Sequence, residues 1–200
     1  ITRDHTENML KSFGADINVE KKNNQTSIYI KGKQELKSKN IHVPSDLSSS
    51  AFFIIAALIN KGSKINLNNI NINPTRDGIL KALKKMGAKI NIKNKKTLSG
   101  EIVADLYVEY SDLVGCELDA EMAKFMIDEY PILSIAAAFA KGTSIFRGLN
   151  ELKVKESNRL ELIRLNLVNC GCACEVINDD LIINPSEEYI PKNNKIRTDF

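Results

Sequence analysis

The chain has 200 residues, of which 43% are hydrophobic and 26% are charged, and its 28 Lys and Arg against 25 Asp and Glu give a formal charge of +3. This composition is typical of one or two globular domains and excludes an intrinsically disordered chain. The longest apolar run, residues 51–59, is too short for a membrane span of about 20 residues, so we expect neither a membrane protein nor a secretion leader. The excess lysines are spread along the chain, which argues against nucleic acid binding.

Two local patterns repeat along the chain. A helix end, a glycine and an alternating strand follow one another around Gly14, Gly87 and Gly171, and glycine suits the left-handed position that ends a helix. An Ala-rich apolar helix, then Lys-Gly and a strand, occurs at residues 51–70 and again at 131–149. These repeats predict an α/β architecture built from modules of about 80 residues.

The first half of the chain contains two predicted breaks. A helix begins near residue 4, with Asp4 or Thr6 as its N-cap, and residues 40–44 predict a linker with a hinge just before Pro44. Asp46 and the serines after it are expected to cap an apolar helix that begins near Ala51. Residues 71–75 predict the second break, and Asp77 then precedes the helix of residues 78–86.

Beyond that helix the pattern changes to extended chain. Residues 89–92 predict a strand that ends in a polar loop, and residues 98–109 predict a second extended segment. The final residues, 190–200, are polar and contain no terminating element, which suggests that the sequence is cut there.

The cysteines do not indicate a disulfide framework. Cys170, Cys172 and Cys174 alternate, so they project from one face if their segment is a strand. A soft metal is one possible ligand, but neither histidine lies near this triplet in the sequence. We therefore expect reduced thiols in a reducing compartment and no metal site.

Residues 127–131, Ile-Asp-Glu-Tyr-Pro, precede the second Ala-rich helix and allow two interpretations. In the structural one, Asp128 caps that helix, Glu129 complements its dipole and Pro131 lies in the first turn. In the functional one, Asp128 lies on the rim of a cleft near a second carboxylate and a cation, and accepts a proton from an alcohol.

Residues 152–160, LKVKESNRL, form the second candidate site. The structural interpretation makes Ser157 an N-cap and pairs Glu156 with Arg159 on the surface. The functional interpretation places Lys155, Glu156 and Arg159 together at a helix N-terminus, where an anionic substrate binds well. Near the start of the chain, Arg3 is either part of a charged helix face or a contact to a bound phosphate.

Taken together, the segments VPSDLSSSAFF, NPTRDGIL, MIDEYPILSIAAAFAKG and LKVKESNRL resemble the family of 3-phosphoshikimate 1-carboxyvinyltransferases, the 5-enolpyruvylshikimate-3-phosphate (EPSP) synthases. The segment TRDHTENML resembles the bacterial branch of that family. The resemblance covers essentially the whole chain. It implies repeated βαβαββ-like units in an inside-out α/β barrel of the enolpyruvyl transferase type, here incomplete, with residues 1–43 ending a first, upper domain and residues 44–200 forming part of a second.

The resemblance also implies an activity. The family transfers the enolpyruvyl group of phosphoenolpyruvate to the 5-hydroxyl of shikimate 3-phosphate and releases phosphate, in the shikimate pathway of aromatic amino acid biosynthesis. It implies no metal and no cofactor, no nucleic acid or membrane partner, a cytoplasmic location and a monomeric full-length enzyme. The family's N-terminal and C-terminal portions are absent from this sequence, so we expect the chain to be inactive alone.

The matching motifs also imply roles for individual residues of this chain. The resemblance implies that Asp128 contacts the shikimate hydroxyls and takes the 5-hydroxyl proton, and that Glu156 transfers a proton at the methylene carbon. It implies that Lys155 and Arg3 contact shikimate 3-phosphate and that Arg159 contacts phosphoenolpyruvate. Glu151 departs from the pattern, because it stands where some relatives have an Asn that contacts the shikimate ring.

Other readings remain open at this stage. One is the related transferase that acts on UDP-N-acetylglucosamine, and another is an RNA-end-processing relative with a similar repeat. A third is a non-catalytic α/β repeat that acts as a binding module. Convergence of Asp128, Glu156 and Arg159 on one cleft favours catalysis, whereas scattered positions favour the binding module.

Overall fold

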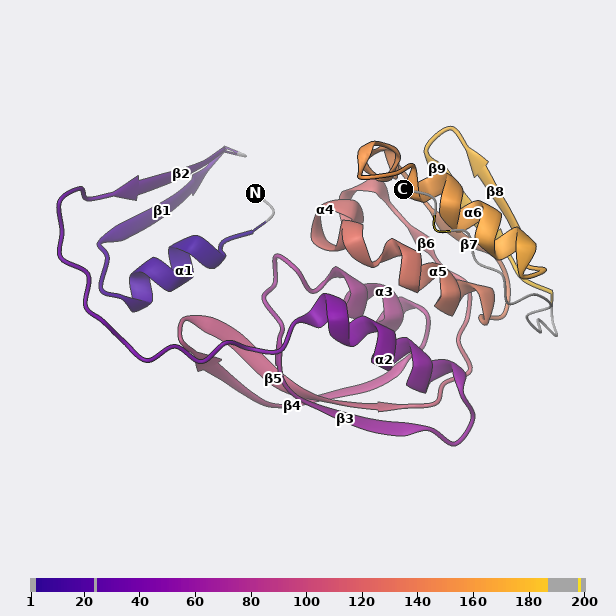
Figure 1. Ribbon diagram of the computed structural model, residues 1–200, viewed down its shortest axis with the longest axis horizontal. Coiled ribbons are helices and arrows are strands. Elements are labelled where there is room, and N and C mark those ends of the chain that lie inside the picture. The colour runs from indigo at the N-terminus through magenta and orange to yellow at the C-terminus, as the bar shows by residue number, and fades with distance from the viewer. Residues whose placement is uncertain (1–2, 24, 187–197, 199–200) are drawn as a thin grey trace.

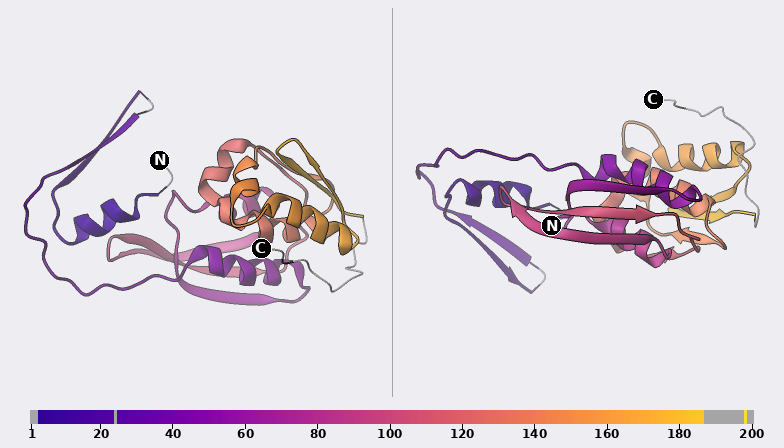
Figure 2. Two further views of the ribbon diagram at one scale, coloured as in Figure 1. Left: turned by 45° about the horizontal axis from the view of Figure 1, so that its top comes forward. Right: turned by 90° about the horizontal axis from the view of Figure 1, so that it is seen from below.

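The computed structural model describes residues 3–23, 25–186 and 198 (Figure 1). The polar segment 190–200 therefore lies outside the described residues, apart from residue 198. The first elements of the chain are α1 (His5–Ser12) and an antiparallel hairpin of β1 (Ile17–Lys22) and β2 (Gln25–Ile30). In Figure 2 the hairpin lies at one side of the molecule and joins it through an extended segment, while α1 contacts the later strand β5.

Two modules follow, each with the element order helix, strand, helix and hairpin. The first contains α2 (Leu47–Ile59), β3 (Lys64–Asn71), α3 (Gly78–Lys85), β4 (Lys89–Leu98) and β5 (Glu101–Glu109). The second contains α5 (Tyr130–Ala138), β7 (Ser144–Phe146), α6 (Arg159–Asn169), β8 (Ala173–Ile177) and β9 (Asp180–Asn184). Between them lie β6 (Glu117–Leu118), α4 (Ala123–Met126) and short 3₁₀ turns at Ala120–Met122 and Ile127–Glu129, and a third 3₁₀ turn covers Asn150–Val154.

The sheet topology confirms the predicted repeat. The strand order is β3-β5-β4 in the first sheet and β7-β9-β8 in the second, so the closing strand of each hairpin lies in the middle. A parallel partner adds to the first strand in both modules: Ser45 bridges Ile70, and β6 pairs with β7. Each module is therefore a βαβαββ unit. Gly62 and Gly142, which are 80 residues apart, have φ angles of 80° and 86° at matching points.

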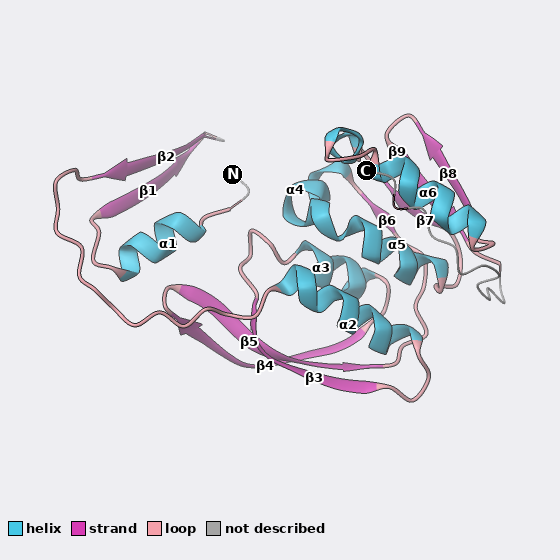
Figure 3. Ribbon diagram, viewed as in Figure 1, coloured by secondary structure: helices cyan, strands magenta, loops and turns pink. Residues whose placement is uncertain are grey.

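Within the two modules, the helices lie toward the centre and the sheets toward the outside. In Figure 3, α2 and α5 lie between the two sheets, and these two helices contact each other as well as their own sheets. Their small residues allow this close approach, since Ala51, Ala136 and Ala137 are fully buried. None of the described helices is both long and apolar enough to cross a lipid bilayer.

Three element boundaries differ from the sequence predictions. α2 begins at Leu47, four residues earlier than expected, because the carboxylate of Asp46 accepts the N–H groups of Ser48 and Ser49 at 3.3 and 2.8 Å. The polar segment after Ile92 continues as β4, since its backbone pairs with β5 through a bulge. At α6 the N-cap is Asn158, whose side chain accepts the N–H of Glu161.

The cysteine triplet does not line one strand face. Cys170 ends α6 and only Cys174 lies within β8, while Cys172 and Cys174 are both buried. None of the described cysteines forms a disulfide, and the described part of the chain has no cluster of three or more possible metal ligands.

Candidate active site

Four predicted site residues meet around one carboxylate. Asp128 lies in the 3₁₀ turn before α5, Lys155 follows the third 3₁₀ turn, Arg159 begins α6 and Arg3 precedes α1. The carboxylate of Asp128 lies 3.5 Å from Arg3, 3.6 Å from Arg159 and 3.7 Å from Lys155. Segments that are far apart in the sequence thus bring three cations to one anion.

The local sequence explains why Asp128 faces outward. Its neighbour Ile127 is buried, and Tyr130 is fully buried with its ring tilted against Phe146 at a centroid distance of 5.6 Å. Pro131 lies in the first turn of α5, as predicted. The predicted capping role of Asp128 is wrong, since the N-cap position belongs to Glu129 and that side chain makes no capping hydrogen bond. Asp128 is left on the rim, with 35% of its side chain exposed.

A second carboxylate shares one of these cations. Arg159 donates to Glu156 at 2.5 Å, which confirms the ion pair predicted from sequence, and its other Nη atom faces Asp128. A backbone hydrogen bond and the hydrogen bond from Arg159 lower the pKa of Glu156, so this carboxylate is charged near neutral pH. Arg159 therefore contacts both carboxylates, although Asp128, Glu156 and Arg159 are not among the residues that line the two cavities described below.

Lys155 also contacts two carboxylates. Its Nζ lies 2.9 Å from Glu151 and 3.7 Å from Asp128. The hydrogen bond to Glu151 raises the pKa of Lys155, burial acts in the opposite direction, and the charge of Asp128 adds to the rise. Lys155 thus carries its charge throughout the neutral range, and Glu151 acts here as its ion-pair partner.

The residue after Asp128 forms an ion pair between a buried carboxylate and a partly exposed arginine. Glu129 is only 2% exposed, and its Oε1 accepts the hydroxyl of Ser48 and lies 3.4 Å from Arg76. Burial raises the pKa of Glu129, the contacts with Ser48 and Arg76 act in the opposite direction, and the charge of Asp128 adds to the rise. The sequence pattern predicted only a helix-dipole role for Glu129, because its partners Ser48 and Arg76 come from separate segments.

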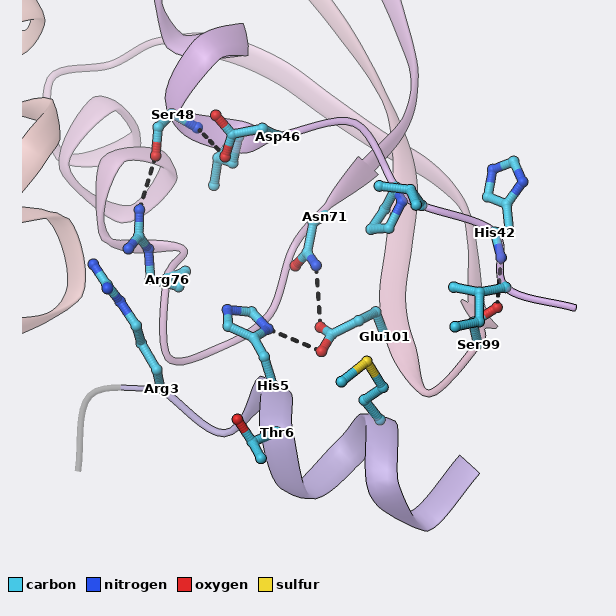
Figure 4. A pocket seen from close by; sticks show the side chains of 15 residues that line it. Arg3, His5, Thr6, His42, Asp46, Ser48, Asn71, Arg76, Ser99 and Glu101 are labelled. Carbon is cyan, nitrogen blue, oxygen red and sulfur yellow. Dashed lines mark hydrogen bonds and ion pairs between the residues drawn. The ribbon is translucent and has the colours of Figure 1, made fainter. Parts of the chain in front are cut away.

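Two cavities of about 490 Å³ each adjoin the cluster, and Arg3 lines both of them. One is also bordered by Lys155 and Glu151. The other is bordered by His5, Ser48 and Arg76, and Figure 4 shows its Arg76–Ser48 and His5–Glu101 contacts. Arg3 thus connects two hollows that are large enough for small anionic molecules.

The side chains of Asp4 and His5 hold the segment that carries Arg3. Asp4 accepts a hydrogen bond from Asn73 at 2.7 Å, and Nδ1 of His5 lies 2.8 Å from Glu101. Asn73 also donates to Glu101. Three consecutive side chains, Arg3 to His5, therefore contact three different segments of the rest of the chain.

Comparison with known proteins gives a consistent result. The family model for "EPSP synthase (3-phosphoshikimate 1-carboxyvinyltransferase)" matches residues 1–198. A 3-phosphoshikimate 1-carboxyvinyltransferase of Paramagnetospirillum magneticum is 48% identical over 200 residues, which is 100% of this chain and 45% of that protein. The corresponding protein of Desulforamulus reducens is 46% identical over 183 residues, or 92% of this chain and 42% of that protein.

Solved structures agree with the sequence matches. An EPSP synthase from Acinetobacter baumannii superimposes with a TM-score of 0.87 at 40% identity, over 94% of this chain and 42% of that one. The enolpyruvyl transferase NikO from Streptomyces tendae, at 18% identity and a TM-score of 0.62 over 88% of this chain and 38% of that one, shares the fold. The chain thus spans less than half the length of the relatives that it matches.

Proposed function

Because the chain belongs to the EPSP synthase family, we propose that it supplies one part of an active site that transfers the enolpyruvyl group of phosphoenolpyruvate to the 5-hydroxyl of shikimate 3-phosphate. Phosphate is released in this reaction, which serves aromatic amino acid biosynthesis. The observation that carries the proposal is the meeting of Asp128 with Arg3, Lys155 and Arg159, and of Arg159 with Glu156.

The chemistry divides among these groups as follows. The 5-hydroxyl oxygen bonds to C2 of phosphoenolpyruvate while C3 gains a proton, and loss of that proton with phosphate then restores the double bond. Asp128 accepts the hydroxyl proton. Glu156 takes up a proton from solvent and delivers it to C3 in the addition step, and its carboxylate then removes a proton from C3 as phosphate leaves. Arg3 and Lys155 hold the phosphate of shikimate 3-phosphate, and Arg159 holds phosphoenolpyruvate.

The cations of the cluster are the groups that two anionic substrates would contact. Arg3, Lys155 and Arg159 share the Asp128 carboxylate, and Glu151 and Glu156 also pair with Lys155 and Arg159. An anionic substrate therefore displaces these carboxylates from the cations that it binds. The same cations stabilise the negative charge that develops as the phosphate leaves. A non-catalytic binding module needs no carboxylate at the centre of such a cluster, whereas a carboxylate placed there can accept a proton.

The proposal includes an organisation of the chain. Residues 1–43 form the end of one domain, residues 44–200 form part of the second, and the hinge lies near Val43 and Pro44. The remaining substrate contacts come from parts of the family's length that this sequence does not span. We expect the whole enzyme to be a cytoplasmic monomer that acts on small molecules, without a cofactor and without a nucleic acid or membrane partner.

A binding titration tests the proposal. We expect shikimate 3-phosphate to shift NMR resonances near Asp128, Lys155 and Arg159 in a saturable way, and we expect Asp128→Ala and Lys155→Ala to abolish these shifts. Lys153 and Asp179 form a 2.7 Å ion pair elsewhere on the surface, so Lys153→Ala and Asp179→Ala are matched controls that should leave the shifts intact. A folded chain that shows no shifts at millimolar ligand contradicts a preformed site on this chain.

Catalysis itself gives a second test. With the 200-residue chain alone, we expect no phosphate release from phosphoenolpyruvate that depends on shikimate 3-phosphate. Release by the chain alone would refute the expectation that the remaining contacts are required.

A further inference from the structure

The geometry around Asp128 raises the question of what fixes its position. Its three cationic partners lie 3.5–3.7 Å away, which is longer than a good N–H···O hydrogen bond. Two of them, Arg3 and Arg159, are long side chains with 55% and 30% exposure. Contacts of this kind attract a carboxylate but do not define its orientation, so the backbone of the 3₁₀ turn must supply the precision.

The contacts of the next residue, Glu129, hold the backbone of this turn. Glu129 is the next residue and its carboxylate is buried, with Oε1 accepting the hydroxyl of Ser48. Arg76 donates to the same hydroxyl at 2.8 Å and lies 3.4 Å from Oε1. Ser48 lies in the first turn of α2, and Arg76 lies in the loop before α3. The turn that carries Asp128 is thus tied to two segments of the other module.

This tie is more than a means of joining α2 to α5. The two helices already pack through buried alanine and aliphatic side chains, so a further apolar contact would serve cohesion at least as well as a buried ion pair. The buried carboxylate of Glu129 instead favours one geometry, because it loses its compensation if Arg76 or Ser48 moves. The second oxygen of Glu129 is buried without a hydrogen-bond partner among the described residues, so the carboxylate is held through Oε1 alone.

We propose that Glu129, paired with Arg76 and bridged by Ser48, is a positioning residue for Asp128 that fixes the 3₁₀ turn so that the Asp128 carboxylate stays among Arg3, Lys155 and Arg159. The link to substrate binding rests on the function proposed above. Because Arg76 also lines the cavity that Arg3 borders, the same pair connects the wall of that cavity to the position of Asp128.

The test compares Glu129→Gln and Arg76→Lys with Val108→Ala, a core variant in β5 that opens a small cavity away from the site. In the 200-residue chain without ligand, we expect both site variants to move the amide resonance of Asp128 and the guanidinium resonances of Arg3 and Arg159. Val108→Ala, with a comparable loss of thermal stability, should leave those resonances in place. Arg76→Lys keeps the charge but not the planar fork, so its effect should be the smaller of the two.

A ligand titration gives the second readout. We expect Glu129→Gln to weaken the binding of shikimate 3-phosphate at least fivefold and Val108→Ala to change it less than twofold. If Glu129→Gln does not fold, the double variant Glu129→Leu/Arg76→Met fills the same space without charge and takes its place, with the same expectations.

The outcomes separate the two proposals. Unchanged resonances of Asp128, Arg3 and Arg159 overturn the positioning role, whatever the affinity. Moved resonances with an unchanged affinity overturn its link to substrate binding. If the wild-type chain binds no shikimate 3-phosphate, the function proposed for this chain fails, and the resonances in the absence of ligand still decide the positioning role.

Discussion

Replacement of the buried Asn73 by Ala tests how the N-terminal segment is held. The Asn73 side chain is 3% exposed and makes four hydrogen bonds: it donates to Asp4 at 2.7 Å and to Glu101 at 3.3 Å, and its Oδ1 accepts the N–H and the hydroxyl of Thr75 at 2.8 Å each. A hydrogen bond between neutral groups contributes about 1 kcal/mol and one to a charged group about 1.5–3 kcal/mol. Allowing for the long Glu101 contact, we expect Asn73→Ala to lower the free energy of unfolding by about 3–5 kcal/mol.

Urea unfolding followed by circular dichroism measures this loss, and two further variants sharpen the test. Asn66→Ala, at an exposed position in β3, should change stability by less than about 0.5 kcal/mol. Asn73→Asp keeps the acceptor for Thr75 but places a third carboxylate beside Asp4 and Glu101. It should therefore be strongly destabilising at pH 7 and recover as the pH falls and the new carboxyl becomes a donor. A loss for Asn73→Ala within 1 kcal/mol of the Asn66→Ala control would refute the reasoning.

Three further predictions concern other sites. Burial opposes the charged form of Asp46, but hydrogen bonds from Ser49 and Ser48 outweigh this effect and lower the pKa of Asp46. Asp46→Ala should therefore lower the free energy of unfolding by about 1 kcal/mol at pH 7. In urea titrations this loss should shrink as the pH falls below 3.8. Gly148 has φ +67° and an added Cβ would lie 2.4 Å from Ala120, so Gly148→Ala should lower the thermal midpoint by several degrees, whereas an unchanged midpoint would contradict the geometry. Burial raises the pKa of Cys172 to about 11 and of Cys174 to about 12, so at pH 8 a thiol reagent should label both only after unfolding, as peptide mapping would show.

The repeated modules were predictable because their signals are local. A glycine after an apolar helix and an alternating strand after that glycine are each defined within about 20 residues, and the φ angles of Gly62 and Gly142 agree with this pattern. The polar strand β4 was not predictable in the same way. Its segment after Ile92 carries few apolar residues, and its extended form depends on pairing with β5.

The candidate site was predictable in part, because its motifs are also local. The residues that meet at Asp128 stood out through motifs, but their contacts depend on how α5, α6 and the N-terminal segment pack together. Glu129 was missed because a carboxylate before an Ala-rich helix is usually a surface group that interacts with the helix dipole. Its partners Ser48 and Arg76 are 81 and 53 residues away, and no local pattern connects them. The one available signal is the scarcity of arginine in this chain, which makes every Arg worth inspecting, Arg76 included.

The run from Arg3 to His5 has a mechanical consequence. Its three side chains reach three separate segments, namely the turn before α5, the loop after β3 and the first residue of β5. Since the three residues share one short stretch of backbone, a rotation of α1 away from these segments pulls on all three contacts together. The three contacts therefore act together. An anion bound by Arg3 opposes the release of the Asp4 and His5 contacts, and loss of the His5 contact weakens the binding of that anion.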